Sequence, residues 1–262
     1  MTVGTVNISL ADSLSAMSGA LFGEPVAAQI HLILVEIRLP RILLAILVGA
    51  VLASTGAVMQ GLFRNPLADP SLIGVSSGAS VGASLMIVVA GGFVETGALM
   101  GLSLVAVGAF VGGFAATLLV YRLATSDIGT SVTTMLLAGI AIGALAGALN
   151  SLFSYFADND MLRQISLWQM GNLSGANWPK VSMMALVAVL LFSAFPRDSR
   201  ALNALLLGES EARHLGIDVQ RVKRRLIILT ALGVGLTVAL AGMVGFVGLI
   251  VPHVVRLLIG PD

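Results

Sequence analysis

Apolar residues occur in long runs along this chain, and short clusters of charged residues separate the runs. A helix that crosses the roughly 30 Å hydrocarbon core of a bilayer needs about 20 apolar residues, and fewer where neighbouring helices bury it. The pattern predicts seven spans, at 38–63, 72–92, 97–121, 130–157, 180–196, 226–241 and 246–259. The last two come from one run that is too long for a single span and is interrupted at 242–245.

The composition fits a protein without a water-exposed surface of ordinary size. Of the 262 residues, 57% are hydrophobic and only 10% are charged, and the mean hydropathy is +1.01. A soluble domain carries about a quarter charged residues. The 30 glycines, against 10 Phe, 2 Tyr and 2 Trp, favour an all-α polytopic bundle packed through small residues over an aromatic-girdled barrel. The absence of cysteine excludes disulfides and thiolate metal ligands, and the net charge of +1 argues against a nucleic-acid partner.

The basic residues divide unequally when the loops between the predicted spans alternate across the membrane. Lys and Arg accumulate in cytoplasmic loops, so the side that holds ten of the 14 is predicted to face the cytoplasm. The first span then starts on the outer side. The inner set is Arg64, Arg122, Arg197, Arg200, Arg213, Arg221, Lys223, Arg224, Arg225 and Arg256, and the outer set is Arg38, Arg41, Arg163 and Lys180.

The sequence offers little catalytic or ion-coupling chemistry. It contains no G-x-x-x-x-G-K-[ST] phosphate loop, so energy from ATP would have to come from another subunit. His31, His214 and His253 lie in distant segments without metal-ligand spacing. Ionisable residues inside spans usually mark proton or ion pathways, and here, apart from Arg256 near the inner end of the last span, the charges flank the spans. An ion-coupled secondary carrier is therefore the weaker alternative, and a membrane enzyme is weaker still.

The longest inner loop, 197–225, places leucines among charged residues. This pattern predicts short amphipathic helices joined by Gly208 and Gly216. Two interpretations fit the pattern equally well. The loop is either a helix on the membrane surface beside a basic flank, or a docking surface for a cytosolic partner.

Four motifs together resemble one family. They are EIRLPR (36–41), GAVMQ leading into RNPLADP (56–70), GVSSGA (74–79) and GFVGLIVPHVVR (245–256). The chain resembles the FecCD/BtuC permeases, the membrane subunits of bacterial ABC importers for heme, iron-siderophores and vitamin B12. The stretch AVMQGLFRNPLADPSLIG (57–74) is most similar to permeases of heme importers.

The resemblance implies ten transmembrane helices with both ends in the cytoplasm. Seven spans that start outside then correspond to a single permease domain, 1–262, that lacks the first helix and the last two, and we expect a chain truncated at both ends. The resemblance also implies a multi-pass protein of the bacterial inner membrane that works as a homodimer. Two ATP-binding cassette subunits would carry ATP and Mg²⁺, a periplasmic protein would deliver the substrate, and this chain would bind no cofactor or metal and catalyse no reaction. Heme or an iron-siderophore complex is the expected cargo, with vitamin B12 as the alternative.

The resemblance also assigns roles to particular residues. Arg38 and Arg41 match arginines that dock the binding protein through its glutamates, although a pair that only reaches the membrane interface fits them too. Ala212 and Leu215 are expected to pack against the ATPase, with Glu209 and Arg213 pairing at the rim. The ATPase-coupling residues are Gly208, Glu209, Ala212, Arg213, Leu215 and Gly216; a stiff inner hairpin contains Asn65, Pro66, Asp69 and Pro70; and Thr130 and Ser131 match the cytoplasmic gate.

Overall fold

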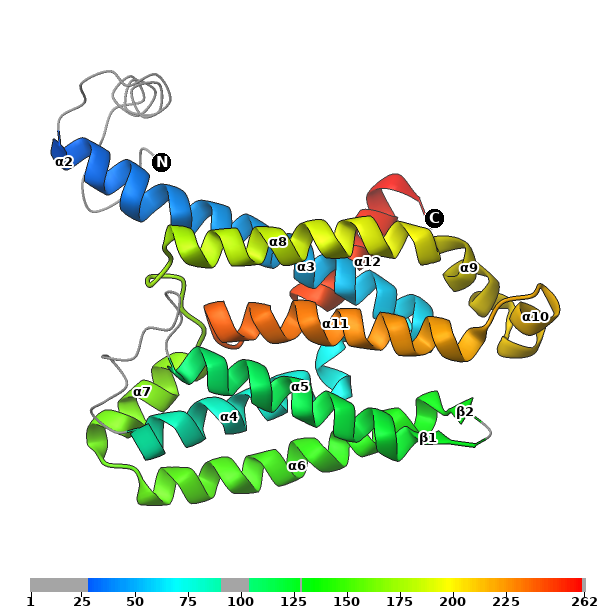
Figure 1. The fold of residues 1–262 in the computed structure, drawn as a ribbon, viewed down its shortest axis with the longest axis horizontal. Coiled ribbons are helices and arrows are strands. Elements are labelled where there is room, and N and C mark those ends of the chain that lie inside the picture. The colour runs from blue at the N-terminus through cyan, green and yellow to red at the C-terminus, as the bar shows by residue number, and fades with distance from the viewer. Residues whose placement is uncertain (1–27, 91–103, 128, 261–262) are drawn as a thin grey trace.

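The computed structural model describes residues 28–90, 104–127 and 129–260, and in these ranges the chain is a bundle of helices with one two-stranded hairpin (Figure 1). The first membrane helix comprises α2 (Ala28–His31), a π-helical segment (Leu32–Arg38) and α3 (Leu39–Phe63). The other elements are a 3₁₀ turn (Pro70–Ile73), α4 (Val75–Ala90), α5 (Leu104–Ala124), β1 (Thr125–Ser126), β2 (Gly129–Thr130), α6 (Val132–Phe156), α7 (Asn159–Gln169), α8 (Trp178–Ala194), a second 3₁₀ turn (Phe195–Asp198), α9 (Ser199–Leu207), α10 (Glu209–His214), α11 (Val219–Ala241) and α12 (Val247–Ile259).

The predicted all-α membrane bundle is confirmed. Five described helical stretches are long and apolar enough to cross a membrane, and the shorter apolar helices α4 and α12 occupy the other two segments predicted as spans. The interruption after Ala241 is also confirmed, because α11 ends there and α12 begins at Val247. Part of the span predicted at 97–121 lies outside the described residues.

Two helix starts differ from the prediction by seven residues or more. The first helix begins at Ala28, ten residues before the predicted start at Arg38, because the apolar stretch Leu32–Val35 continues the helix past Glu36. α11 begins at Val219, seven residues before the predicted start at 226. Asp218 caps that start by accepting a hydrogen bond from the Arg221 amide, so the basic residues 221–225 lie on the first turns of a helix and not in a loop.

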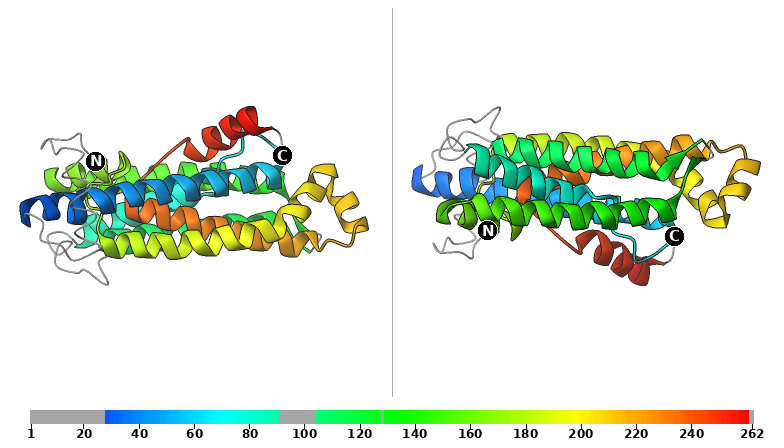
Figure 2. Two further views of the ribbon diagram at one scale, coloured as in Figure 1. Left: turned by 90° about the horizontal axis from the view of Figure 1, so that it is seen from above. Right: turned by 90° about the horizontal axis from the view of Figure 1, so that it is seen from below.

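The helices run roughly parallel to one axis, and their connections gather at two ends (Figures 1 and 2). The α7 end carries α7 and the start of the first helix. The α10 end carries α9, α10 and the β1–β2 hairpin. The predicted inner loops 122–130 and 197–225 thus lie together at the α10 end, while the outer loop 158–179 lies at the α7 end.

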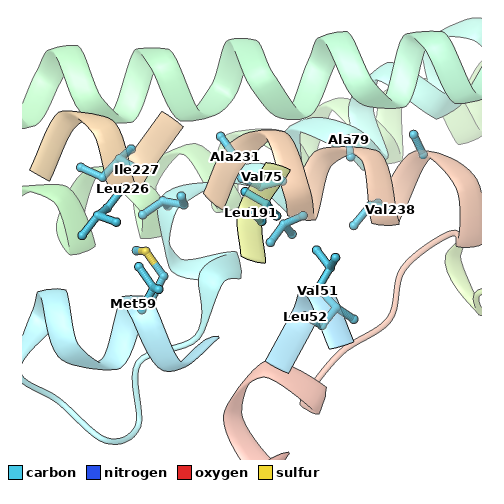
Figure 3. Close-up of a cluster of buried hydrophobic side chains, with 14 of the residues drawn as sticks. Val51, Leu52, Met59, Val75, Ala79, Leu191, Leu226, Ile227, Ala231 and Val238 are labelled. Carbon is cyan, nitrogen blue, oxygen red and sulfur yellow. The ribbon is translucent and has the colours of Figure 1, made fainter. Parts of the chain in front are cut away.

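The core centres on α11. Two thirds (67%) of its apolar stretch is buried, against 17% for α6 at the edge of the bundle. Leu226, Ile227, Ala231 and Val238 of α11 meet side chains from α3, α4 and α8 (Figure 3). α11 is therefore positioned to hold the surrounding helices in register.

Small residues let two helix pairs approach to backbone contact. A Cβ on Gly82 of α4 would lie 2.0 Å from the Gly108 carbonyl oxygen of α5. A Cβ on Gly56 of α3 would lie 1.9 Å from the Gly248 carbonyl oxygen of α12. These contacts confirm that the glycine-rich segments serve tight helix packing.

Candidate functional site

The α9–α10 pair forms a projection at the α10 end of the bundle (Figure 1). Gly208 joins the two short helices with a φ of +130°, and Gly216 leaves α10 with a φ of +80°, conformations that residues with side chains rarely adopt. The prediction of short helices joined by Gly208 and Gly216 is confirmed, because Gly208 lies between α9 and α10 and Gly216 lies between α10 and α11. Leu206, Leu207 and Leu215 are exposed on the projection, with 57%, 71% and 65% of their surfaces accessible.

Ala212 corrects one expectation about this projection. Its side chain is fully buried within the chain, so it cannot pack against a partner protein. Its burial instead holds α10 against the rest of the chain, and the Ile217 amide donates a hydrogen bond back to the Ala212 carbonyl at 3.1 Å. The apolar surface that remains available for a partner is therefore leucine-rich.

Glu209 has two basic partners. Its carboxylate lies 3.8 Å from Arg213, the pair expected at the rim, and 2.6 Å from the ammonium group of Lys223 on α11. The Arg213 contact is exposed and contributes little to stability. Lys223 is 1% exposed, so its contact with Glu209 is largely shielded from water. Glu209 thus ties α10 to α11 as well as facing the surface.

Thr130 and Ser131, the residues expected at a gate, lie where the β1–β2 hairpin enters α6. Thr130 is buried, and its hydroxyl lies 2.9 Å from the Thr125 hydroxyl across the hairpin. Ser131 is exposed and caps α6 by accepting a hydrogen bond from the Thr134 amide at 3.3 Å. The hairpin itself was not predicted from the sequence, because its strands are only two residues long.

The segment expected to be a stiff inner hairpin is ordered by its own polar side chains. Asn65 accepts a hydrogen bond from the Leu67 amide at 2.9 Å, and Asp69 caps the following 3₁₀ turn by accepting from the Ser71 amide at 2.8 Å. The segment turns back between α3 and α6, where the Leu72 carbonyl faces Gly139 of α6. Pro70 is buried, whereas Pro66 is exposed. These two hydrogen bonds order the segment locally, and its stiffness stays a prediction.

Arg38 and Arg41 lie one helical turn apart near the α7 end. Arg41 is exposed, and one guanidinium nitrogen donates to the Ser174 carbonyl at 3.2 Å in the loop before α8. Arg38 is half buried and ends the π-helical segment. The helix extends ten residues beyond Arg38 to Ala28, so these arginines flank the side of the first helix and do not form its tip.

Reasoning from the sequence missed the residues that hold these pieces together. Lys223 and Gln220 of α11 both bind Thr130, and Arg225 forms an ion pair with the buried Asp198 at the start of α9. The sequence did contain a signal that Lys223 is buried. It follows Val219 by four residues and precedes Ile227 by four, which places it on the buried face of the helix.

The described residues contain no group of three or more His, Asp or Glu side chains that could hold a metal ion.

Comparison of the sequence with known proteins agrees with the membrane fold described above. The FecCD transport family model matches residues 1–262. The chain belongs to the FecCD transport family. The resemblance read from the four sequence motifs is therefore confirmed.

Relatives in this family are transport permeases with different cargoes. The chain is 44% identical over 227 residues to the hemin transport system permease protein HmuU of Yersinia pestis, covering 87% of this chain and 67% of the relative. It is 43% identical over 245 residues to the cobalamin import system permease protein BtuC of Halobacterium salinarum, covering 92% of this chain and 62% of the relative. It is 41% identical over 254 residues to the vitamin B12 import system permease protein BtuC of Salmonella typhi, covering 95% and 75%.

A solved structure shows the same fold. It is assigned to a metal-chelate type ABC transporter in an inward-facing conformation, and it aligns with a TM-score of 0.82 and 32% identity. The alignment covers 99% of this chain and 76% of that chain. The bundle is therefore a BtuC-like permease fold, and the chain spans about three fifths to three quarters of the length of the FecCD relatives described above.

Proposed function

We propose that this chain is the transmembrane permease subunit of an ABC importer in the bacterial inner membrane. The observation that carries the proposal is the exposed leucine surface of α9–α10, formed at the end of the bundle where most of the basic residues gather. Exposed apolar side chains ringed by charges are typical of a surface that another protein covers. In a FecCD family member, the partner that this surface fits is an ATP-binding cassette subunit.

The proposed assembly is a homodimer of this chain with two ATPase subunits and a periplasmic binding protein. ATP and Mg²⁺ are bound by the ATPase subunits, and this chain contributes a path whose access alternates between the two sides. Closure of the ATPase subunits pushes α10, and the Asn65–Pro70 segment and the Thr130–Ser131 gate respond to that push. Arg38 and Arg41 receive acidic residues of the binding protein at the α7 end.

The proposed cargo is heme or an iron-siderophore complex, and vitamin B12 is the alternative. Support for heme comes from the hemin permease of Yersinia pestis, and the neighbouring solved structure is assigned to the metal-chelate type. Support for the alternative comes from the two cobalamin permeases at similar identity. All three cargoes are bulky metal complexes, and in such systems the binding protein performs much of the selection.

Uptake into proteoliposomes tests the function and separates it from an ion-coupled carrier. The transporter assembled with its ATPase and binding protein should accumulate one of hemin, a ferric siderophore or cyanocobalamin only when ATP is supplied. Ionophores that collapse proton and sodium gradients should leave uptake unchanged. The control is the same assembly with an ATPase subunit that binds but does not hydrolyse ATP. Accumulation by this chain alone, driven by an ion gradient, would show that the proposal is wrong.

A further inference from the structure

One buried side chain connects three elements at the α10 end. The Lys223 ammonium group donates to the Glu209 carboxylate at 2.6 Å and to the Thr130 carbonyl oxygen at 2.7 Å. Glu209 is the first residue of α10, and Thr130 is the last residue of the β1–β2 hairpin before α6. A charged group in a protein interior is tolerated only when it is paired and hydrogen-bonded, so neither contact can be lost without leaving a buried charge unsatisfied.

The backbone of Thr130 is held on its other side as well. The Thr130 amide donates to the Gln220 side-chain oxygen at 2.9 Å, and Gln220 lies one turn before Lys223 on α11. Gly129 makes this contact sterically feasible, because it has a φ of +125° and a Cβ there would lie 2.4 Å from the Gln220 side-chain nitrogen. Both polar backbone groups of Thr130 are therefore bound by side chains of α11.

A second ion pair fixes the start of the α9–α10 projection. Asp198, at the start of α9 and 2% exposed, pairs with Arg225, two residues after Lys223. The projection is thus joined to the first turns of α11 at the start of α9 and at the start of α10. α10 therefore cannot move relative to α11 unless an ion pair breaks.

We propose that Lys223 is a positioning residue that makes α10 and the entrance of α6 move as one body. The proposal rests on the proposed function, in which an ATPase subunit pushes α10. Because the same ammonium group binds Glu209 and the Thr130 carbonyl, movement of α10 carries the gate residues with it. Without the ammonium group, α10 can still follow the ATPase, but the direct link from Glu209 to the Thr130 carbonyl is lost, and Thr130 stays joined to α11 through Gln220 and no longer follows α10 directly.

A purely stabilising role for Lys223 predicts a different result. Loss of a structural contact lowers the amount of folded transporter, and ATP hydrolysis and uptake then fall together. Loss of a mechanical link lowers the amount of cargo moved for each ATP hydrolysed. The ratio of uptake to hydrolysis therefore distinguishes the two roles.

The first experiment places Lys223→Met in the assembled transporter in proteoliposomes. Methionine fills a similar volume without donating a hydrogen bond. We expect ATP hydrolysis within about twofold of the unaltered transporter and an uptake-to-hydrolysis ratio lower by about tenfold, which is a typical size for coupling between sites. Arg224→Met is the matched control, because Arg224 is exposed on the next position of α11. An unchanged ratio in an assembled Lys223→Met transporter would overturn the proposal.

A second experiment covers the case in which Lys223→Met fails to fold. Glu209→Gln keeps the size of the side chain and removes the charge that faces Lys223, whose hydrogen bond to the Thr130 carbonyl oxygen is left in place. Glu211→Gln, exposed on the same helix, is its control. The native chain contains no cysteine, so Ser126→Cys and Ser210→Cys place spin labels only on the hairpin and on α10.

The distance between the spin labels at positions 126 and 210 should remain constant through the ATP cycle when Glu209 is unaltered and in Glu211→Gln. The same distance should change with ATP in Glu209→Gln. A distance in Glu209→Gln that stays constant, or a distance in the unaltered chain that changes with ATP, would overturn the link. If the unaltered transporter shows no ATP-driven uptake, the proposed function fails. If the unaltered transporter shows full uptake and the variants are fully coupled, the proposed role of Lys223 is wrong and the proposed function stands.

Discussion

Arg41 contributes to the structure in addition to its proposed role in docking. Its hydrogen bond to the Ser174 carbonyl ties α3 to the loop before α8, yet the residue is exposed. A guanidinium group has five donors, so one backbone contact leaves several for a carboxylate of a partner. Arg38 lies one turn away on the same helix. The two arginines can therefore present a paired basic surface at the α7 end.

The charge-reversed variant Arg38→Glu with Arg41→Glu should weaken binding of the periplasmic protein and leave the ATPase bound. We expect a loss of about tenfold in affinity, or about 1.4 kcal/mol, that grows at low salt, because the partner's glutamates would then face like charges. Surface plasmon resonance on the purified complex measures this. Arg163→Glu, which reverses an exposed charge on α7, is the control. Equal affinity in all forms at low salt would show that neither arginine belongs to the docking surface.

At the scale of elements, contacts with α11 hold α9 and α10 in place, because α10 is too short to be stable on its own. α10 spans only six residues, too few for an isolated helix to persist in water. The buried Ala212 and the ion pairs to Lys223 and Arg225 hold the two helices, while Leu206, Leu207 and Leu215 remain exposed. The result is a rigid projection with an apolar surface available to a partner.

Leu215→Asp should detach the ATPase subunit. A carboxylate at the centre of an apolar interface loses the packing of the leucine and is costly to desolvate, and we expect binding to weaken by at least about 2 kcal/mol, roughly 30-fold. Co-purification of the two subunits in detergent measures the effect. Ser199→Asp adds the same charge at the exposed start of α9, where a helix N-terminus favours it. Unchanged co-purification of the Leu215→Asp form would place the ATPase elsewhere.

Across the whole molecule, the basic residues are segregated between the two ends of the bundle. The α10 end includes the hairpin after Arg122, the α9–α10 projection and the basic first turns of α11, whereas the α7 end carries Arg163 and Lys180. Because Lys and Arg are retained on the cytoplasmic side during insertion, the α10 end is expected to face the cytoplasm. This orientation places the leucine-rich projection where an ATPase would meet it.

Cysteine labelling tests this orientation. The native chain has no cysteine, so Arg163→Cys and Ser210→Cys each provide a single exposed reactive site, at the α7 end and the α10 end respectively. In intact spheroplasts a membrane-impermeant maleimide should label Arg163→Cys at once and Ser210→Cys only after the membrane is opened. Both variants should react to the same extent in detergent. The reverse order of labelling would show that the α10 end faces outward and that the assigned orientation is wrong.

The sequence by itself determined the class of fold, the break between α11 and α12, and the family. Long hydrophobic runs indicate segments that are buried in lipid, and motifs such as RNPLADP and GVSSGA are local in the chain. It also predicted short helices in 197–225 that Gly208 and Gly216 join, because the leucine spacing and the two glycines are local signals.

Only the tertiary structure showed that Ala212 points inward, that α11 starts at Val219, and that Lys223 joins Glu209 to Thr130. Glu209 and Thr130 lie 14 and 93 positions from Lys223 in the chain, and Asp198 lies 27 from Arg225. Which charged residue pairs with which partner depends on how the helices pack in three dimensions. A hydropathy pattern contains no information about distances between separate helices, so the packing alone decides these contacts.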